Sequence, residues 1–325
     1  MKIDIHSHLI DRHYYDTLIR DLRLELHRTA EGQTLMRRDG YTFLWYRDAM
    51  FDLDHRLRVM DEQGIDMRVL SLSSPNVYDW QGDAQVAMAR HVNDMTAAIT
   101  RRHPDRFAGL ASLPLGNIEA SLSELDRAIQ ELDLRGVMIG SNIAGAQLDD
   151  AIFEPIWARI DALRLPVFEH PMFPPGLKKE RFELPLRLGF VFDTTTVATR
   201  LIYSGVFERY PNFPYIMAHT GGALLSLLER LDNGYRLFPD CREHISKLPS
   251  EYAKSLYYDT CSFSAPVLMM AREIAGADHI LFGSDEPMIG RGTDVVDHLP
   301  IDDREKSLIL GGNAARLLRI ATHSP

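Results

Sequence analysis

The chain has 325 residues, of which 45% are hydrophobic and 25% are charged, the profile of a globular protein with a large core. Its formal net charge is −10 and no stretch concentrates lysine and arginine, so neither a nucleic-acid partner nor an anionic membrane surface is expected. No apolar run reaches the roughly 18 residues that a membrane helix needs, and the opening MKIDIHSH lacks the apolar run of a signal peptide. These features predict a cytoplasmic protein.

Short apolar runs rich in β-branched residues alternate with segments of helical period, and the alternation repeats eight times. The expected strands cover residues 2–8, 67–73, 107–115, 136–141, 166–171, 215–221, 256–262 and 279–287. Parallel pairing through right-handed crossovers would close eight such units into a (β/α)8 TIM barrel of the α/β class. A doubly wound open sheet is the alternative. We expect one barrel domain over residues 1–325.

A segment with apolar residues recurring every three or four positions follows each expected strand. Asp83 and Asp193 are candidate N-caps of two of these helices, and Gly64 and Gly276 are candidate ends of two others. The expected helices cover residues 53–65, 83–103, 118–132, 151–165, 193–210, 223–236, 265–276 and 303–319.

One segment, about residues 10–50, does not follow the strand–helix alternation. It contains a glycine-centred turn and the alternating run YTFLWYR, which together predict an insertion made of a helix and a small β-hairpin. Long insertions in barrels lie at or beside the C-terminal ends of the strands. The insertion is therefore expected either to cover an active site or to add surface only.

Five side chains that can bind metal fall at the ends of four expected strands. His6 and His8 are two apart on the first strand, so both imidazoles project to the same side. His170 ends the fifth strand, His219 the sixth and Asp285 the eighth. Because the C-terminal ends of barrel strands meet around one pocket, these residues are expected to be neighbours. Packing explains such a set poorly, since buried histidine and aspartate are costly unless they are paired or ligating.

The residues at these strand ends favour one divalent metal ion. The fourth strand ends in VMIGSN, which offers no lysine or glutamate to bridge a second ion. His6, His8, His170 and Asp285 would supply three nitrogens and one carboxylate and leave a position open for water or substrate. Zinc suits these ligands, and manganese is the alternative. His219 would then move protons, because an imidazole ordinarily titrates near neutrality, or it would serve as a fifth ligand.

The motifs MKIDIHSH, FEHP, AHTGG and GSD together resemble those of the metal-dependent amidohydrolase superfamily. The resemblance is strongest to its subgroup of 2-amino-3-carboxymuconate-6-semialdehyde decarboxylases and γ-resorcylate-type decarboxylases. It implies that His6, His8, His170 and Asp285 bind the metal and that His219 is catalytic. It also implies that Arg47, in the segment YRDAMFDLDHRLRVMDEQGID, binds a substrate carboxylate, and that the protein is a homodimer.

The activity that this resemblance implies is non-oxidative decarboxylation of a small unsaturated or aromatic carboxylic acid, with Asp285 or His219 handling the proton. The same site could serve a hydrolase or hydratase acting on a lactone, an amide or a ring-cleavage product. A metal-binding protein without catalysis is the third possibility, and it would need a closed coordination sphere. The motifs leave the substrate open.

Overall fold

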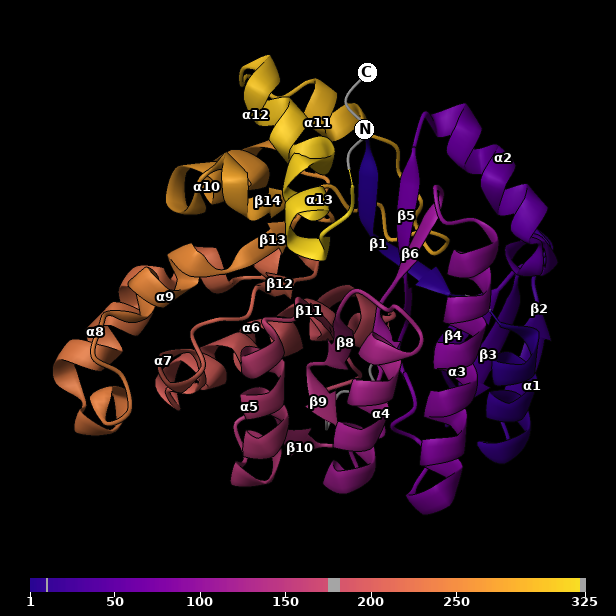
Figure 1. Cartoon of the computed structure of the whole chain (residues 1–325), viewed down its shortest axis with the longest axis horizontal. Coiled ribbons are helices and arrows are strands. Elements are labelled where there is room, and N and C mark those ends of the chain that lie inside the picture. The colour runs from indigo at the N-terminus through magenta and orange to yellow at the C-terminus, as the bar shows by residue number, and fades with distance from the viewer. Residues whose placement is uncertain (10, 175–181, 322–325) are drawn as a thin grey trace.

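A computed structural model of the chain describes residues 1–9, 11–174 and 182–321. Parallel strands alternate with helices along most of the described length, and the last described helix, α13 (Asn313–Leu318), packs against the first strand (Figure 1). Every expected strand is present, although most are shorter than predicted. The barrel strands are β1 (Ile3–Leu9), β5 (Met67–Leu72), β6 (Phe107–Gly109) continued by β7 (Ala111–Ser112), β8 (Val137–Gly140), β11 (Val167–His170), β12 (Tyr215–Met217), β13 (Tyr257–Asp259) and β14 (Ile280–Leu281).

Hydrogen bonds join these strands into a ring. One sheet has the order β1–β5–β6, and the other has the order β7–β8–β11–β12–β13–β14. Only Leu110 separates β6 from β7, so the two sheets are continuous there. At the other junction the Ile5 N–H donates to the Phe282 carbonyl (2.9 Å), and Ser7 forms a parallel bridge with Glu286. The predicted (β/α)8 barrel is therefore confirmed, and the open sheet is excluded.

Amphipathic helices pack around the barrel, as the spacing of their apolar residues predicts. In α4, for example, Ser121, Glu124, Leu125 and Ala128 are buried at intervals of three and four. The described α-helices that follow the insertion are α2 (Leu53–Gln63), α3 (Gly82–Arg102), α4 (Ile118–Gln130), α5 (Glu154–Leu163), α6 (Phe190–Tyr203), α7 (Val206–Arg209), α8 (Leu228–Leu237), α9 (Pro249–Ser255), α10 (Ala265–Ala275), α11 (Asp294–Asp297), α12 (Asp303–Ser307) and α13 (Asn313–Leu318).

Two of the four predicted helix boundaries are correct. Gly64 ends α2 in the left-handed conformation (φ 62°), and Gly276 ends α10. The predicted N-caps are wrong. Asp83 lies inside the first turn of α3, and Asp193 lies inside α6 because that helix begins earlier, at Phe190. The Asp193 carboxylate is thereby free to accept a hydrogen bond from the Asn142 side chain (2.8 Å).

The expected insertion, about residues 10–50, begins at residue 10, which lies outside the described residues, and it lies beside the barrel (Figure 1). It contains α1 (Arg12–Asp21) and an antiparallel sheet of β2 (Glu25–Arg28), β3 (Thr34–Arg38) and β4 (Tyr41–Tyr46). β3 and β4 form the predicted hairpin, with Gly40 (φ 84°) in the turn. The third strand, β2, was not predicted because its residues are all exposed and show no apolar alternation.

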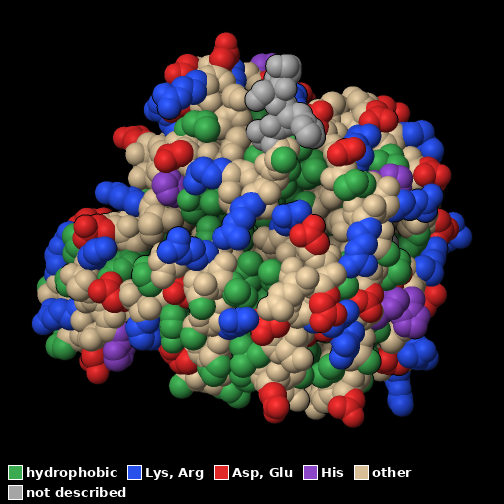
Figure 2. Space-filling model, viewed as in Figure 1, with side chains coloured by type: hydrophobic (Ala, Val, Ile, Leu, Met, Phe, Trp, Pro, Cys, Tyr) green, Lys and Arg blue, Asp and Glu red, His purple; other side chains and the backbone are tan. Residues whose placement is uncertain are grey.

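The surface of the barrel carries charges of both signs. On the face shown in Figure 2, basic and acidic side chains are scattered among polar and apolar ones. The described part of that face therefore has no continuous area of a single charge. Among the described residues, no helix combines the length and the apolar character needed to cross a membrane.

Candidate metal centre

Two barrel strands, β1 and β11, and the segment that follows β14 place the predicted metal ligands together. His6 and His8 are alternate residues of β1, His170 is the last residue of β11, and Asp285 comes shortly after β14. All four side chains are buried, and one ligand atom from each lies within 4.8 Å of the others. The structure therefore brings together, at one end of the barrel, four residues that are far apart in sequence.

The spacing of the ligand atoms fits a metal ion. The His6 Nε2 atom lies 3.2 Å from His8 Nε2, and the Asp285 Oδ1 atom lies 3.2 Å from His8 Nε2 and 3.4 Å from His6 Nε2. Bonds of about 2.0–2.1 Å in a tetrahedral zinc site would place ligand atoms about 3.3 Å apart. These residues can therefore hold one divalent ion without a change in the backbone.

Hydrogen bonds on the far side of two rings set which nitrogen faces the site. The His6 Nδ1 atom lies 2.6 Å from the Asp259 Oδ2 atom, and His170 Nδ1 lies 3.1 Å from the Pro171 carbonyl oxygen. Because these oxygens can only accept, both Nδ1 atoms carry the proton and each Nε2 keeps its lone pair for a metal. The rings are thus held in the tautomer that coordination requires.

The electrostatics of the site favour the ligating forms of most of these groups. Burial, with the nearby His8 and His6 rings, holds the pKa of His170 well below the usual imidazole value, and burial also lowers the pKa of His8. Burial alone would raise the pKa of Asp285, but His6, His219 and His8 outweigh it and hold that pKa well below its usual range. Neutral imidazoles and an ionised carboxylate are the forms that bind metal.

Asp259 belongs to this site, and the sequence analysis missed it. It ends β13 and is fully buried, with Oδ2 on His6 and Oδ1 accepting the Thr220 N–H (2.8 Å) and the Cys261 N–H (2.9 Å). The rule that selected His170, to look for polar residues at the ends of barrel strands, would also have selected Asp259. Its carboxylate holds the His6 ring in the orientation that metal binding needs.

Replacing Asp259 with asparagine is expected to weaken metal binding by about 10- to 100-fold, because the His6 ring loses its charged orienting partner. Titration of the metal-free protein with Zn²⁺ or Mn²⁺ measures this affinity. Glu169→Gln is the matched control, since Glu169 is also a buried strand carboxyl but bonds Thr194 (3.0 Å). Equal metal affinities in the Asp259→Asn variant and the wild type would show that Asp259 does not orient His6.

His219 lies next to the ligand group but outside it. It follows β12, and its Nε2 atom is 3.8 Å from the Asp285 Oδ2 atom. Among the described residues, the ligand atoms that lie within 4.8 Å of one another come from His6, His8, His170 and Asp285, and His219 contributes none of them. His219 has φ 53°, a left-handed conformation that is uncommon for histidine and is often found at functional sites. At this distance a proton could pass between His219 and the Oδ2 atom of Asp285 through one bridging water or substrate oxygen.

A buried charged network supports the segment that carries Asp285. Ser284 donates from its hydroxyl (2.6 Å) and its backbone N–H (3.0 Å) to Asp4. Arg68 lies 3.5 Å from Asp4 and 3.3 Å from Glu286, and Arg56 lies 3.3 Å from the other oxygen of Glu286. Burial raises the pKa of Asp4 to about 6, although Arg68 opposes the shift. Both neighbours of Asp285 are thus fixed by residues of β1, β5 and α2.

A cavity of about 560 Å³ opens above the ligand group. The insertion contributes Leu35 of β3 and residues 42–45 of β4 to its wall, so the insertion covers this end of the barrel rather than only adding surface. Many of the lining side chains are apolar, and His170, His219 and Asp285 face the cavity. The described lining residues are Gln33, Leu35, Thr42, Phe43, Leu44, Trp45, Ser73, Ser74, His170, Glu183, Leu186, Arg187, Phe190, Val191, His219, Asp285, Met288 and Ile289.

Arg47 is not brought to this cavity. It precedes the short 3₁₀ helix Asp48–Phe51, is exposed to solvent, and has its guanidinium 5.8 Å from the centre of the Trp45 ring. Trp45 lines the cavity, whereas Arg47 is not among the described lining residues. The role given to Arg47 as a substrate ligand therefore gains no support from this geometry and stays a prediction.

Comparison with known proteins agrees with this geometry. The family model described as "Amidohydrolase" matches residues 3–320. A 2-amino-3-carboxymuconate-6-semialdehyde decarboxylase from Dictyostelium discoideum is 29% identical, over 98% of this chain and 91% of the relative. A γ-resorcylate decarboxylase from Polaromonas sp. strain JS666 is 30% identical, over 92% of this chain and 98% of the relative.

A solved structure with the same fold contains a metal. The dihydroxybenzoic acid decarboxylase from Polaromonas sp. JS666, solved with bound manganese and the inhibitor 2-nitroresorcinol, superposes with a TM-score of 0.83 at 26% identity. The match covers 98% of this chain and 97% of that one. One divalent ion at the ligand group is supported by this relative and by the ligand geometry. The chain belongs to the amidohydrolase family.

Proposed function

We propose that this protein is a metal-dependent, non-oxidative decarboxylase of an aromatic or similarly unsaturated carboxylic acid. The observation that carries the proposal is the convergence of His6, His8, His170 and Asp285, next to a cavity with many apolar lining residues into which His170, Asp285 and His219 face. The relatives described above are decarboxylases by name. No organic cofactor is required for this chemistry.

In the proposed reaction a proton is added to the carbon that carries the carboxylate, and the bond to that carboxylate then breaks. The bonding electron pair returns to the carbon framework, and carbon dioxide leaves. His219 and Asp285 are the groups placed to handle the proton, because Nε2 of His219 lies 3.8 Å from Oδ2 of Asp285. A bound divalent ion would act as a Lewis acid toward substrate oxygens.

The walls of the cavity suit a planar, partly apolar substrate. Phe43, Trp45 and Phe190 offer aromatic surface, and Leu186 and Met288 add aliphatic surface. Such walls exclude water, which strengthens the electrostatic interactions between the site and a charged substrate. A ring held between these side chains would present its carboxylate to the polar base of the cavity.

We propose Zn²⁺ as the metal, because three imidazole nitrogens and one carboxylate are ligands that zinc accepts readily. Manganese, present in the Polaromonas structure, is the alternative. Elemental analysis of protein purified without chelators identifies the ion. We expect about one divalent ion per chain, as the four ligands of a single site require.

The function is tested by measuring carbon dioxide release from a panel that includes 2,6-dihydroxybenzoate, 6-methylsalicylate and a muconate-type acid. Removal of the metal by dialysis against a chelator is expected to abolish release, and re-addition of the ion is expected to restore it. Release that continues undiminished in metal-free protein would contradict the proposal. Turnover of a lactone or an amide, with no carbon dioxide from any acid, would instead identify a hydrolase.

A further inference from the structure

An arginine at the cavity wall is placed where a substrate anion could reach it. Arg187 lies in the helical turn Pro185–Gly189, which leads directly into α6. Its side chain lines the same cavity as His170, His219 and Asp285. Three residues later, the Phe190 ring centre is 6.3 Å from that of His170. The turn that carries Arg187 is thus fixed next to the candidate metal ligands.

Among the described residues, the guanidinium of Arg187 has no anionic partner. No carboxylate of the described residues lies within ion-pair distance of this guanidinium. Glu183 is one helical turn away on the same segment but does not pair with it. Glu183 is engaged elsewhere, since its Oε1 atom accepts a hydrogen bond from Thr42 Oγ1 (3.1 Å). An arginine facing a cavity without a counter-ion can bind an incoming anion without first breaking an ion pair.

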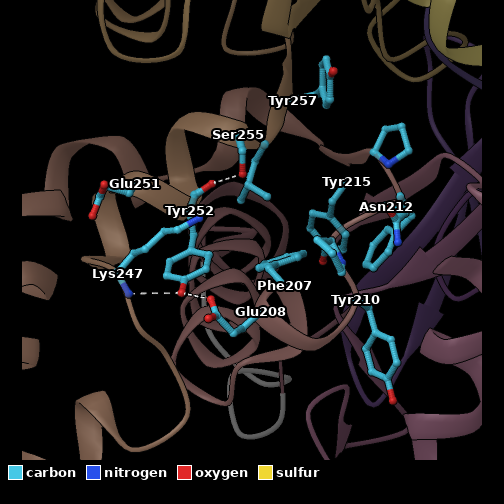
Figure 3. A pocket seen from close by; sticks show the side chains of 14 residues that line it. Phe207, Glu208, Tyr210, Asn212, Tyr215, Lys247, Glu251, Tyr252, Ser255 and Tyr257 are labelled. Carbon is cyan, nitrogen blue, oxygen red and sulfur yellow. Dashed lines mark hydrogen bonds between the residues drawn. The ribbon is translucent and has the colours of Figure 1, made fainter.

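A second cavity shows the contrasting case. It has a volume of about 510 Å³, lies where β12 and β13 begin, and shares no described lining residue with the first cavity (Figure 3). There Glu208 already accepts hydrogen bonds from the hydroxyls of Tyr252 and Ser246, and the Asn212 side chain donates to Asp161 (2.9 Å). Glu208 and Asn212 are thus paired with protein partners and are less available to a ligand than Arg187 is, whereas Lys247, which also lines this cavity, lies 5.9 Å from the centre of the Tyr252 ring.

We propose that Arg187 binds the carboxylate of the substrate, the role that the sequence resemblance assigns to Arg47. This inference rests on the proposed function. The planar guanidinium can donate two parallel hydrogen bonds to a carboxylate. Among the described lining residues, Arg187 is the one arginine or lysine. Both arginines are exposed to solvent, but Arg187 belongs to this lining and Arg47 does not.

The test compares salicylate with salicylamide, its neutral amide of nearly the same shape, by calorimetric titration of metal-loaded protein. The wild type is expected to bind salicylate more tightly than salicylamide. Arg187→Gln is expected to weaken salicylate binding by roughly 10- to 100-fold, the usual effect of losing a charged hydrogen-bonding pair, and to leave salicylamide binding unchanged. Arg187→Lys should fall between the two, because lysine keeps the charge and loses the planar fork.

Arg47→Gln is the matched control, since it removes the same group from the other candidate position, and it is expected to bind both ligands as the wild type does. Wild-type affinity for salicylate in Arg187→Gln would overturn the proposal, as would a loss confined to Arg47→Gln. A wild type that does not discriminate between the two ligands would overturn it as well. Binding is measured without turnover, so absence of decarboxylation in the separate carbon dioxide assay would count against the proposed function alone.

Discussion

Replacing His219 with alanine is expected to leave the metal bound and to lower kcat by about 100- to 10 000-fold, the usual contribution of a positioned acid or base. The ligand group of His6, His8, His170 and Asp285 is complete without His219, so metal content should not change. The variant would lack the imidazole whose Nε2 atom lies 3.8 Å from the Oδ2 atom of Asp285, and the proposed proton path between the two residues would be lost. Elemental analysis and carbon dioxide release, on the same preparation, measure the two effects.

Two further histidine variants make this result specific. His8→Ala removes a ligand and is expected to lose both metal and activity. His298→Ala changes an exposed histidine outside the ligand group, whose Nδ1 atom lies 2.7 Å from the Asp294 carbonyl oxygen, and it is expected to keep both. If His219→Ala lost the metal together with the activity, His219 would be a fifth ligand. If it remained fully active, His219 would have no role in the proton transfer.

Replacing Arg68 with methionine is expected to lower the free energy of unfolding by about 3–5 kcal/mol, which is the usual cost of removing one partner from a buried ion pair. Arg68 is fully buried, lies 3.5 Å from Asp4 and 3.3 Å from Glu286, and donates to Gln63 (2.8 Å). Methionine has a similar length but leaves both carboxyls without this counter-charge. Urea denaturation followed by circular dichroism measures the change.

Arg58→Met is the matched control for this variant. Arg58 lies on α2 and pairs weakly with Asp52 (3.9 Å) at the surface, so little change in stability is expected. Because the Arg68 network holds Ser284 and Glu286, the residues on either side of Asp285, Arg68→Met should also weaken metal binding. An Arg68→Met variant as stable as Arg58→Met would show that the buried pairs do not contribute to stability.

Much of the fold could be predicted from the sequence because it depends on local patterns. Alternation of short apolar strands with amphipathic helices indicated eight βα units, and the closed barrel follows from how such units pack. The helix ends at Gly64 and Gly276 were predicted for the same local reason. Asp193 was wrongly predicted as an N-cap, because the extra turn that begins at Phe190 depends on tertiary packing and leaves no signal at Asp193 itself.

The candidate metal ligands were predictable because a rule of topology converts sequence position into spatial position. In a parallel barrel the C-terminal ends of the strands meet, so His6, His8, His170 and Asp285 could be grouped from their places in the sequence alone. Asp259 obeys the same rule and was overlooked. Arg68 was overlooked in the same way. A charged residue in an otherwise apolar expected strand indicates a buried ion pair, here with Asp4 and Glu286.

By itself, the sequence determined the barrel and the strand ends that carry the candidate ligands, since both follow from short-range patterns combined with one packing rule. The family was indicated separately, by the resemblance of four short motifs. Only the tertiary structure decided which arginine lines the cavity next to the candidate metal ligands. Arg47 ends the alternating run YTFLWYR and Arg187 lies in a segment without strand periodicity, and at both positions the direction of the side chain is fixed by long-range contacts. For Arg187 that contact is the packing of Phe190 against His170, which no local pattern encodes.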